Sequence, residues 1–260
     1  FTLKGAGVSG TQNLTFIGKP NNGTISNTVG SKQLLLTGNP YASAIDANQF
    51  ITDNSSSITG TLYFWEHYQT NNSHNLAEYQ GGYAVKNFSG SVGPSSLGVK
   101  FISGNGTSLK NAPNQYIPVG QGFFVVGKDN GVGVQSSVTF RNSQRAFVKE
   151  HNPTGSQSLY RIPAKPKESA HWTSSNEEPV EKDTYKRIRL GFNNYNQIFH
   201  RQVVLAFMED KANSEFNDGY DAKNIDNVVN DMYLVNGTNK LIIEGEGYFN
   251  KEASYPIGVK

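Results

Sequence analysis

The chain has 260 residues, enough for one large β domain or for two ordinary domains that each bury a substantial core. Lys and Arg (23) nearly balance Asp and Glu (21), so the net charge of +2 gives no electrostatic argument for binding nucleic acid or an anionic membrane. Cysteine is absent, which excludes disulfides, thiolate metal sites and cysteine nucleophiles. No apolar run approaches the roughly 20 residues of a membrane-spanning helix, so we expect no membrane insertion.

In the first half of the chain, apolar runs that alternate with turn residues predict short strands separated by turns. An apolar run at residues 34–36 ends before Pro40, which has no backbone N–H and restricts the preceding residue to extended angles. A second apolar run, residues 61–65, follows the turn cluster Asp53-Asn54-Ser55. In residues 117–126, two glycines precede a fully apolar run, which is typical of a strand that enters a core.

The second half begins after the segment that is the best candidate for a domain boundary. This segment contains four prolines, several Ser and Thr residues and a cluster of charged residues. Beyond it, residues 187–192 alternate cleanly and residues 202–208 resemble a buried strand. Asn236-Gly237 joins two further strands and is the clearest hairpin signal in the chain. The only helix candidate is residues 221–232.

These patterns predict an all-β fold of two β-sandwich, jelly-roll-like lobes, with antiparallel strands and very little helix. The first lobe covers residues 1–150, and a linker rich in Pro and Ser covers residues 151–184. The second lobe covers residues 185–260 and is open to completion by another strand. The chain opens at Phe1 with no signal peptide, which suggests a processed or excised segment of something longer.

An acidic loop at residues 209–226 is the strongest chemical cluster. Calcium takes six to eight oxygens from carboxylates, amides and carbonyls, so a calcium site is one interpretation of this loop, and no other cofactor is expected. Its candidate ligands are Asp210, Asn217, Asp218, Asp221 and Asp226, with Glu209 and Asn224 nearby. The alternative is a solvated turn region in which Asp and Asn bind backbone N–H groups. A weaker oxygen-rich loop contains Asp46, Asn48, Asp53 and Asn54.

Exposed aromatic rings could stack on sugars, so Trp65, Tyr68 and Trp172 are candidate glycan-binding residues. The alternative is packing at the rim or in the core of an aromatic-rich β protein. Glu66 and Glu78 could imitate a glycosidase pair, although Trp65 beside them is better explained as core. The five histidines show no paired metal spacing, and no G-x-S-x-G nucleophile elbow is present.

A set of short motifs occurs in a fixed order along nearly the whole chain. They include Thr15-Phe-Ile-Gly-Lys-Pro-Asn-Asn-Gly23, Gly38-Asn-Pro-Tyr-Ala-Ser-Ala-Ile-Asp46, Gly60-Thr-Leu-Tyr-Phe-Trp65, Gly81-Gly-Tyr83, Gly120-Gln-Gly-Phe-Phe-Val125, Arg141-Asn-Ser-Gln-Arg145, Arg187-Ile-Arg-Leu190, Phe216-Asn-Asp-Gly-Tyr-Asp-Ala222 and Leu241-Ile-Ile-Glu-Gly245. Together they resemble the β-sandwich region that precedes the C-terminal sorting domain in many large surface proteins of Bacteroidetes, which the type IX secretion system exports. The sorting domain itself is not in this sequence.

The resemblance implies a β-sandwich and an extracellular or cell-surface location. It implies little about activity, because such parent proteins include adhesins, filament-like surface proteins and enzymes. Our first hypothesis is therefore a non-catalytic structural or adhesive segment of a bacterial cell-surface or filament-forming protein. Its expected partners are further copies of itself or surface glycans, by strand addition in the first case. The alternatives are a carbohydrate-binding module of a larger secreted enzyme and a hydrolase with an unrecognised carboxylate pair.

Overall fold

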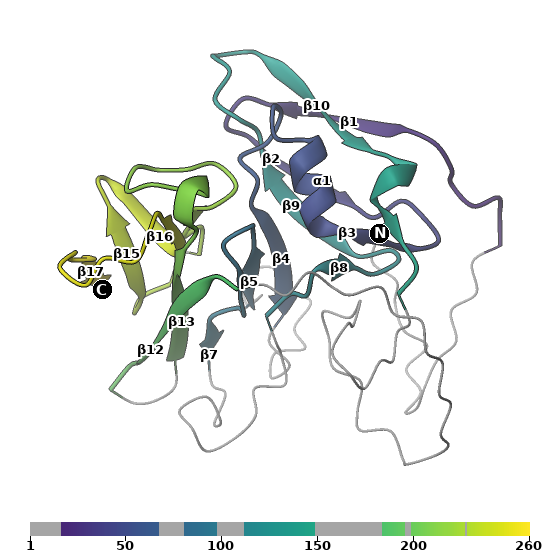
Figure 1. Ribbon diagram of the computed structural model, residues 1–260. Helices are drawn as coiled ribbons and strands as arrows, with labels where there is room; N and C mark the ends of the chain where they lie inside the picture. The colour runs from purple at the N-terminus through teal and green to yellow at the C-terminus, as the bar shows by residue number, and fades with distance from the viewer. Residues whose placement is uncertain (1–16, 68–80, 98–111, 149–183, 196–198, 227) are drawn as a thin grey trace, which may run out of the picture.

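The computed structural model describes residues 17–67, 81–97, 112–148, 184–195, 199–226 and 228–260 (Figure 1). Strands account for most of their regular structure, which confirms the prediction of an all-β fold. The strands are β1 (Ile25–Gly30), β2 (Leu34–Gly38), β3 (Ala44–Asp46), β4 (Leu62–His67), β5 (Gly81–Lys86), β6 (Ser91–Val92), β7 (Ser96–Leu97), β8 (Tyr116–Ile117), β9 (Gly122–Val126), β10 (Gln135–Phe140), β11 (Arg145–Ala146), β12 (Lys186–Asn193), β13 (Phe199–Phe207), β14 (Ala222–Lys223), β15 (Met232–Asn236), β16 (Asn239–Glu246) and β17 (Ile257–Val259).

The described strands form four sheets. A five-stranded sheet has the order β2-β9-β4-β5-β6, and a larger sheet has the order β12-β13-β16-β15-β17, with β14 and β7 attached to β16 and β13. Two small sheets, β1-β10 and β11-β3-β8, accompany the five-stranded sheet. The pairings are antiparallel except that of β13 with β16, which is parallel.

The five-stranded sheet contributes side chains from its two faces to two hydrophobic cores. Successive side chains of a strand point to opposite faces. In β4, Leu62 and Phe64 pack with α1 (Ala47–Asp53) in the first core, whereas Tyr63 packs into the second. In Figure 1 this sheet accordingly lies between α1 with the small sheets on one side and the C-terminal sheet on the other.

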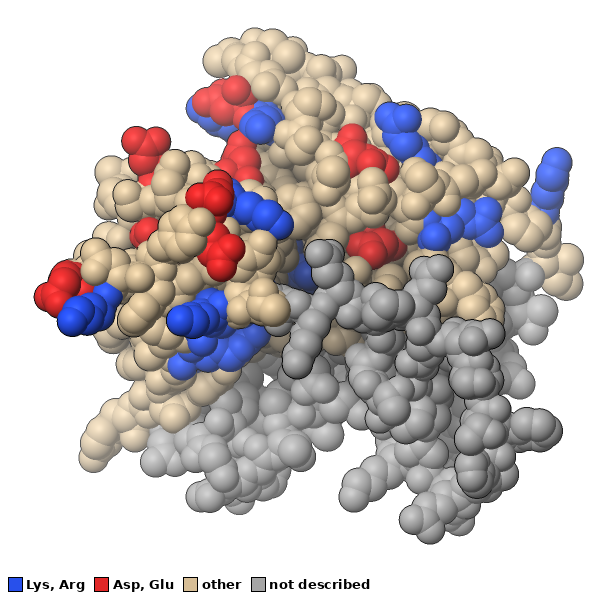
Figure 2. Space-filling model, in the orientation of Figure 1, with Lys and Arg blue, Asp and Glu red and all other residues tan. Residues whose placement is uncertain are grey.

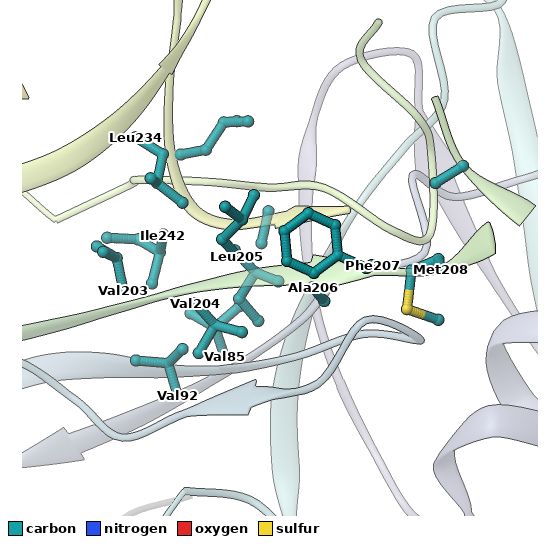
Figure 3. Close-up of a cluster of buried hydrophobic side chains, with 14 of the residues drawn as sticks. Val85, Val92, Val203, Val204, Leu205, Ala206, Phe207, Met208, Leu234 and Ile242 are labelled. Atoms are coloured by element: carbon teal, nitrogen blue, oxygen red, sulfur yellow. The ribbon is translucent and has the colours of Figure 1, made fainter. Parts of the chain in front are cut away.

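The second core is built around β13, whose side chains from Val203 to Phe207 are all buried. Figure 3 shows Val85 of β5 and Val92 of β6 pointing toward Val204 of β13, so strands from the first half of the chain close the core of the second half. Strand β7 also pairs directly with β13. The two halves of the chain are therefore joined by a shared core and by backbone pairing. Their description as two sandwich lobes stays a prediction.

The helix prediction at residues 221–232 is wrong. That segment contains the two-residue β14 and an irregular stretch before β15, because its Asp side chains bind backbone N–H groups and a buried arginine instead of capping a helix. The one α-helix in the described residues is α1, which follows Asp46. The Asp46 carboxylate caps it by accepting bonds from the N–H groups of Asn48 (2.8 Å) and Gln49 (3.1 Å).

The strongest strand predictions are confirmed. Strand β2 ends at Gly38, before Pro40, and β15 and β16 form the predicted hairpin with Gly237 at a φ of 58°. The predicted linker, residues 151–184, lies outside the described residues except for Thr184. Among the described residues, no helix has the length and apolar character needed to cross a membrane.

Candidate functional site

The predicted calcium ligand Asp226 belongs to a buried ion-pair network instead of an open oxygen cluster. Arg201 of β13, only 1% exposed, donates to Asp226 (2.8 Å) and through its Nε to Asp231 (2.6 Å). Asp226 also accepts from the Tyr83 N–H (3.1 Å), and Asp231 accepts from the Asn224 amide (2.6 Å). These donors satisfy the carboxylates that neutralise a charge buried in the second core.

Asp221 is buried and holds backbone rather than a metal. One carboxylate oxygen accepts from the Gly245 N–H (2.7 Å) and the other from the Asn217 N–H (2.6 Å). Burial raises the pKa of Asp221 to about 6, and the two backbone N–H groups oppose that rise. This carboxylate ties the acidic loop to strand β16.

The rest of the acidic loop fastens the two halves of the chain together. The Gly219 N–H donates to the Thr59 carbonyl (2.8 Å), and the Gly219 carbonyl accepts from the Phe88 N–H (2.9 Å). Asp218 forms an ion pair with Lys128 at 3.2 Å. The loop is therefore bound to the first half of the chain by backbone hydrogen bonds and by an ion pair.

The five proposed calcium ligands are thus divided among separate interactions. Asp210 bonds the Tyr248 hydroxyl, and the Asn217 amide donates to the Asn213 carbonyl (2.9 Å). Within the described residues, no group of three or more His, Asp or Glu side chains is arranged to hold a metal ion. Calcium at this loop stays a prediction, and binding it would require displacing the donors that these oxygens already have.

The weaker oxygen-rich loop is the α1 segment. Asp46 caps the helix, and Asp53 accepts from the amides of Gln49 (2.6 Å) and Gln144 (2.8 Å). Asn54 is 1% exposed and bonds both the N–H (2.7 Å) and the carbonyl (3.0 Å) of Thr139. These side chains join α1 to β10.

The candidate glycan-binding and acid–base residues are only partly described. Trp65 on β4 is 37% exposed, and its ring packs edge-on against Tyr83 at 5.0 Å. Tyr68 and Trp172 lie outside the described residues, as do Glu78 and the side chain of Glu66. Of the histidines, the His200 ring lies 2.9 Å from the Asn193 carboxamide oxygen, and burial lowers its pKa, with Arg201 adding to the effect.

The structure instead reveals a concave site between the two cores, which we call the basic cleft. It has a volume of about 700 Å³. Four of its lining residues are cationic, and the described lining contains no carboxylate side chain. The lining residues are Asn48, Thr52, Lys86, Phe88, Gly90, Ser91, Pro113, Asn114, Gln115, Thr184, Tyr185, Arg187, Arg189, Met208, Lys211 and Tyr220.

Strand β12 places two of these cations side by side. Arg187 and Arg189 are two residues apart, so both project from the same face of the strand. The Arg187 Nε donates to the Ser89 carbonyl (2.5 Å), and Arg189 donates to the Ser91 carbonyl (2.9 Å). The backbone carbonyls of Ser89, between β5 and β6, and of Ser91, in β6, therefore fix both guanidinium groups against the cleft wall.

The remaining lining residues contribute a deep cation, an unmatched acceptor and aromatic surface. Lys86 is 8% exposed. The Asn48 Oδ1 atom is buried and accepts no hydrogen bond within the described structure. The rings of Phe88 and Tyr220 lie 5.4 Å apart, and the Lys211 ammonium lies 5.3 Å above the Tyr185 ring. The cleft thus offers positive charge, a hydrogen-bond acceptor and apolar ring faces to a ligand.

A family model described as Domain of unknown function (DUF8693) matches residues 4–260. The chain belongs to this family. No curated protein and no solved structure matches the chain. The family description assigns no activity, so the functional argument depends on the geometry of the cleft.

The basic cleft could not be recognised from the sequence because its cations come from distant parts of the chain, and the 23 basic residues of the whole chain are nearly balanced by 21 acidic ones. Figure 2 shows that acidic and basic side chains are interspersed over the visible face of the molecule, so the overall charge gives no hint of one basic site. The one local signal was the alternation of Arg187 and Arg189, which already placed both cations on the same face of a strand.

Proposed function

We propose that this chain is a non-catalytic adhesive segment of a bacterial cell-surface protein and that it binds surface glycans in the basic cleft. The observation that carries the proposal is the cleft itself, a concave site whose walls come from both cores and whose lining combines ring faces with polar groups. The ordered motifs shared with exported surface proteins support the extracellular location.

A binding role fits the chemistry of the cleft better than glycoside hydrolysis does. Glycosidases place two carboxyl groups across the scissile bond, and the described lining of the cleft contains no carboxylate side chain. Its walls are also held rigidly, by α1 on one side and by the eight-residue pairing of β12 with β13 on the other. A rigid wall lowers the entropic cost of binding a ligand.

The test is a glycan array probed with the wild-type chain and with two tryptophan variants on the same helix. Thr52 lies on the exposed side of α1 and lines the cleft, whereas Gln49 is exposed on α1 outside it. We expect Thr52→Trp to abolish array binding by filling the cleft, and Gln49→Trp to leave it intact. Binding that survives Thr52→Trp, or an array without any bound glycan, would refute the proposal.

Self-association is the second candidate, and strand β17 favours it. This strand lies at one edge of the C-terminal sheet, and its Ile257 and Val259 side chains are 46% and 62% exposed. A second copy that added a strand there would bury both apolar side chains. Light scattering coupled to size-exclusion chromatography tests it. Oligomers that disappear in Ile257→Lys would support strand addition, and a monomer at all concentrations would exclude it.

A further inference from the structure

We propose that the ligand of the basic cleft is an acidic glycan, a chain of sugars that carry carboxylate or sulfate groups. This inference rests on the proposed function and names the chemical class of its ligand. Three features of the cleft lining carry it: the cations, the unmatched acceptor and the ring faces.

The Arg189 guanidinium favours negative charge on the ligand. Arg189 donates to the Ser91 carbonyl (2.9 Å) and to the Gln202 side-chain oxygen (3.2 Å), both of them neutral acceptors. Its guanidinium forms no ion pair with an acidic side chain in the described part of the chain. A guanidinium presents several donors in a fixed fork, a geometry that matches a carboxylate or a sulfate.

The charges on β12 also favour an anionic ligand. Burial lowers the pKa of Arg189, and repulsion from Arg187 lowers it further. Because Arg stays protonated under all ordinary conditions, this repulsion persists between two fixed charges. An anion seated beside Arg189 would interact favourably with both positive charges.

Charge alone does not select a sugar, but the rest of the cleft lining does. The buried Asn48 Oδ1 needs a hydrogen-bond donor, which a carboxylate or sulfate cannot supply and a sugar hydroxyl can. The rings of Phe88 and Tyr220 line the cleft and provide apolar surface for the C–H groups of a sugar. A cleft of about 700 Å³ suits an oligosaccharide, whereas a nucleic acid would need a longer basic surface than these four cations provide.

The experiment measures binding by isothermal titration calorimetry with three probes. Oligogalacturonate carries carboxylates, a heparin-derived tetrasaccharide carries both carboxylates and sulfates, and methyl-esterified oligogalacturonate keeps the sugar but loses the charge. We expect both acidic probes to bind, with an affinity that falls as salt rises, and the esterified probe to bind at least about tenfold more weakly. The comparison of the two acidic probes shows whether the sulfated probe binds more tightly than the one that carries carboxylates alone.

The variants are Arg189→Gln and a matched control, Arg145→Gln. Arg145 is also exposed and also donates to neutral side-chain oxygens, those of Ser43 (3.0 Å) and Asn22 (3.4 Å), but it lies outside the cleft. We expect Arg189→Gln to weaken acidic-probe binding by about tenfold or more and Arg145→Gln to leave it unchanged. Circular dichroism spectra and unfolding midpoints verify that both variants fold.

Three outcomes would overturn the inference: equal binding of the charged and esterified probes, no effect of Arg189→Gln, or no binding of any probe. If the charged and esterified probes bind equally and Thr52→Trp abolishes the binding of both, the acidic ligand is overturned but the proposed glycan-binding function still stands. Tighter binding of a single-stranded oligonucleotide than of either acidic probe would identify a nucleic-acid site instead.

Discussion

The acidic loop and the basic cleft treat their polar groups in opposite ways. In the loop, Asp221 and Asp226 are buried, and their oxygens accept bonds from backbone N–H groups and from Arg201. In the cleft, Arg189 has neutral partners and the Asn48 oxygen has no donor in the described structure. A cluster whose bonds are complete stabilises the fold, whereas a cluster with unmet bonds is suited to a ligand.

This difference predicts that substitutions in and around the loop affect stability, whereas substitutions in the cleft affect binding. The loop interactions stabilise the second core and bind it to the first core. Arg187 and Arg189 on β12 lie at the rim of that assembly and contact it through the carbonyls of Ser89 and Ser91.

The largest expected effect is that of Arg201→Met. Removing the guanidinium leaves the carboxylates of Asp226 and Asp231 buried without their counter-charge, which we expect to cost about 3–5 kcal/mol in the free energy of unfolding. Denaturant titration monitored by fluorescence measures the cost. A loss below about 1 kcal/mol would show that the network does not stabilise the fold and would contradict the structural role assigned to it.

The acidic loop approaches the first half of the chain closely at Gly60, and this contact predicts the second-largest loss of stability. Gly60 has a φ of 75°, and a Cβ added there would lie 2.6 Å from the Gly219 Cα. We expect Gly60→Ala to cost about 2–4 kcal/mol, because backbone strain and overpacking add.

Gly120→Ala is the control for this substitution. Gly120 has a similar φ of 71°, but a Cβ there meets no atom within 4 Å. The control should therefore cost only about 1–2 kcal/mol from strain. Equal losses in the two variants would show that the loop does not press against residues 59–61.

A buried carboxylate beside the loop predicts a pH dependence of stability. Glu244 is 4% exposed, its Oε2 accepts no bond within the described structure, and burial raises its pKa to about 7. Because the folded state then binds the proton more tightly than the unfolded state, the contribution of Glu244 is fully present below about pH 4 and is lost as the pH rises to about 7.

The variant Glu244→Gln tests this dependence. It keeps the shape of the side chain and removes the buried charge, so we expect its unfolding midpoint at pH 8 to rise by about 2–4 °C, with little change at pH 4. Differential scanning calorimetry at both pH values gives the comparison. A lower midpoint at pH 8 would mean that the carboxylate has a stabilising partner when ionised.

The smallest expected effect is that of chelation. The loop oxygens already accept hydrogen bonds, so we expect EDTA to shift the unfolding midpoint by less than about 1 °C relative to added calcium. A shift of several degrees that Asp218→Asn abolishes would instead support the calcium site predicted from the sequence.

The sequence predicted local structure where a single residue type determines it. Pro40 marked the end of β2, and Asn236-Gly237 marked the β15–β16 hairpin. The seven-residue helix α1 was missed because Asp53-Asn54-Ser55 suggests a turn as strongly as a helix end, although Asp46 is a regular helix-capping residue.

The function of the acidic side chains could not be predicted from their spacing. The same Asp and Asn residues suit a calcium loop, a turn region or a buried network, and only the fold determines which donors reach them. Arg201, which shares a face of β13 with the apolar residues Phe199 and Val203, was the available signal, since a buried guanidinium requires an acidic partner. The cleft depends on packing between residues as distant as Asn48 and Arg189, which no local pattern encodes.

The most direct test of the account is hydrogen exchange by mass spectrometry with and without a saturating acidic oligosaccharide. We predict slower exchange in residues 86–91 and 185–189, which form the walls of the basic cleft, and unchanged exchange in residues 222–231 of the Arg201 network. Protection centred on residues 222–231, with no change at the cleft walls, would contradict the account.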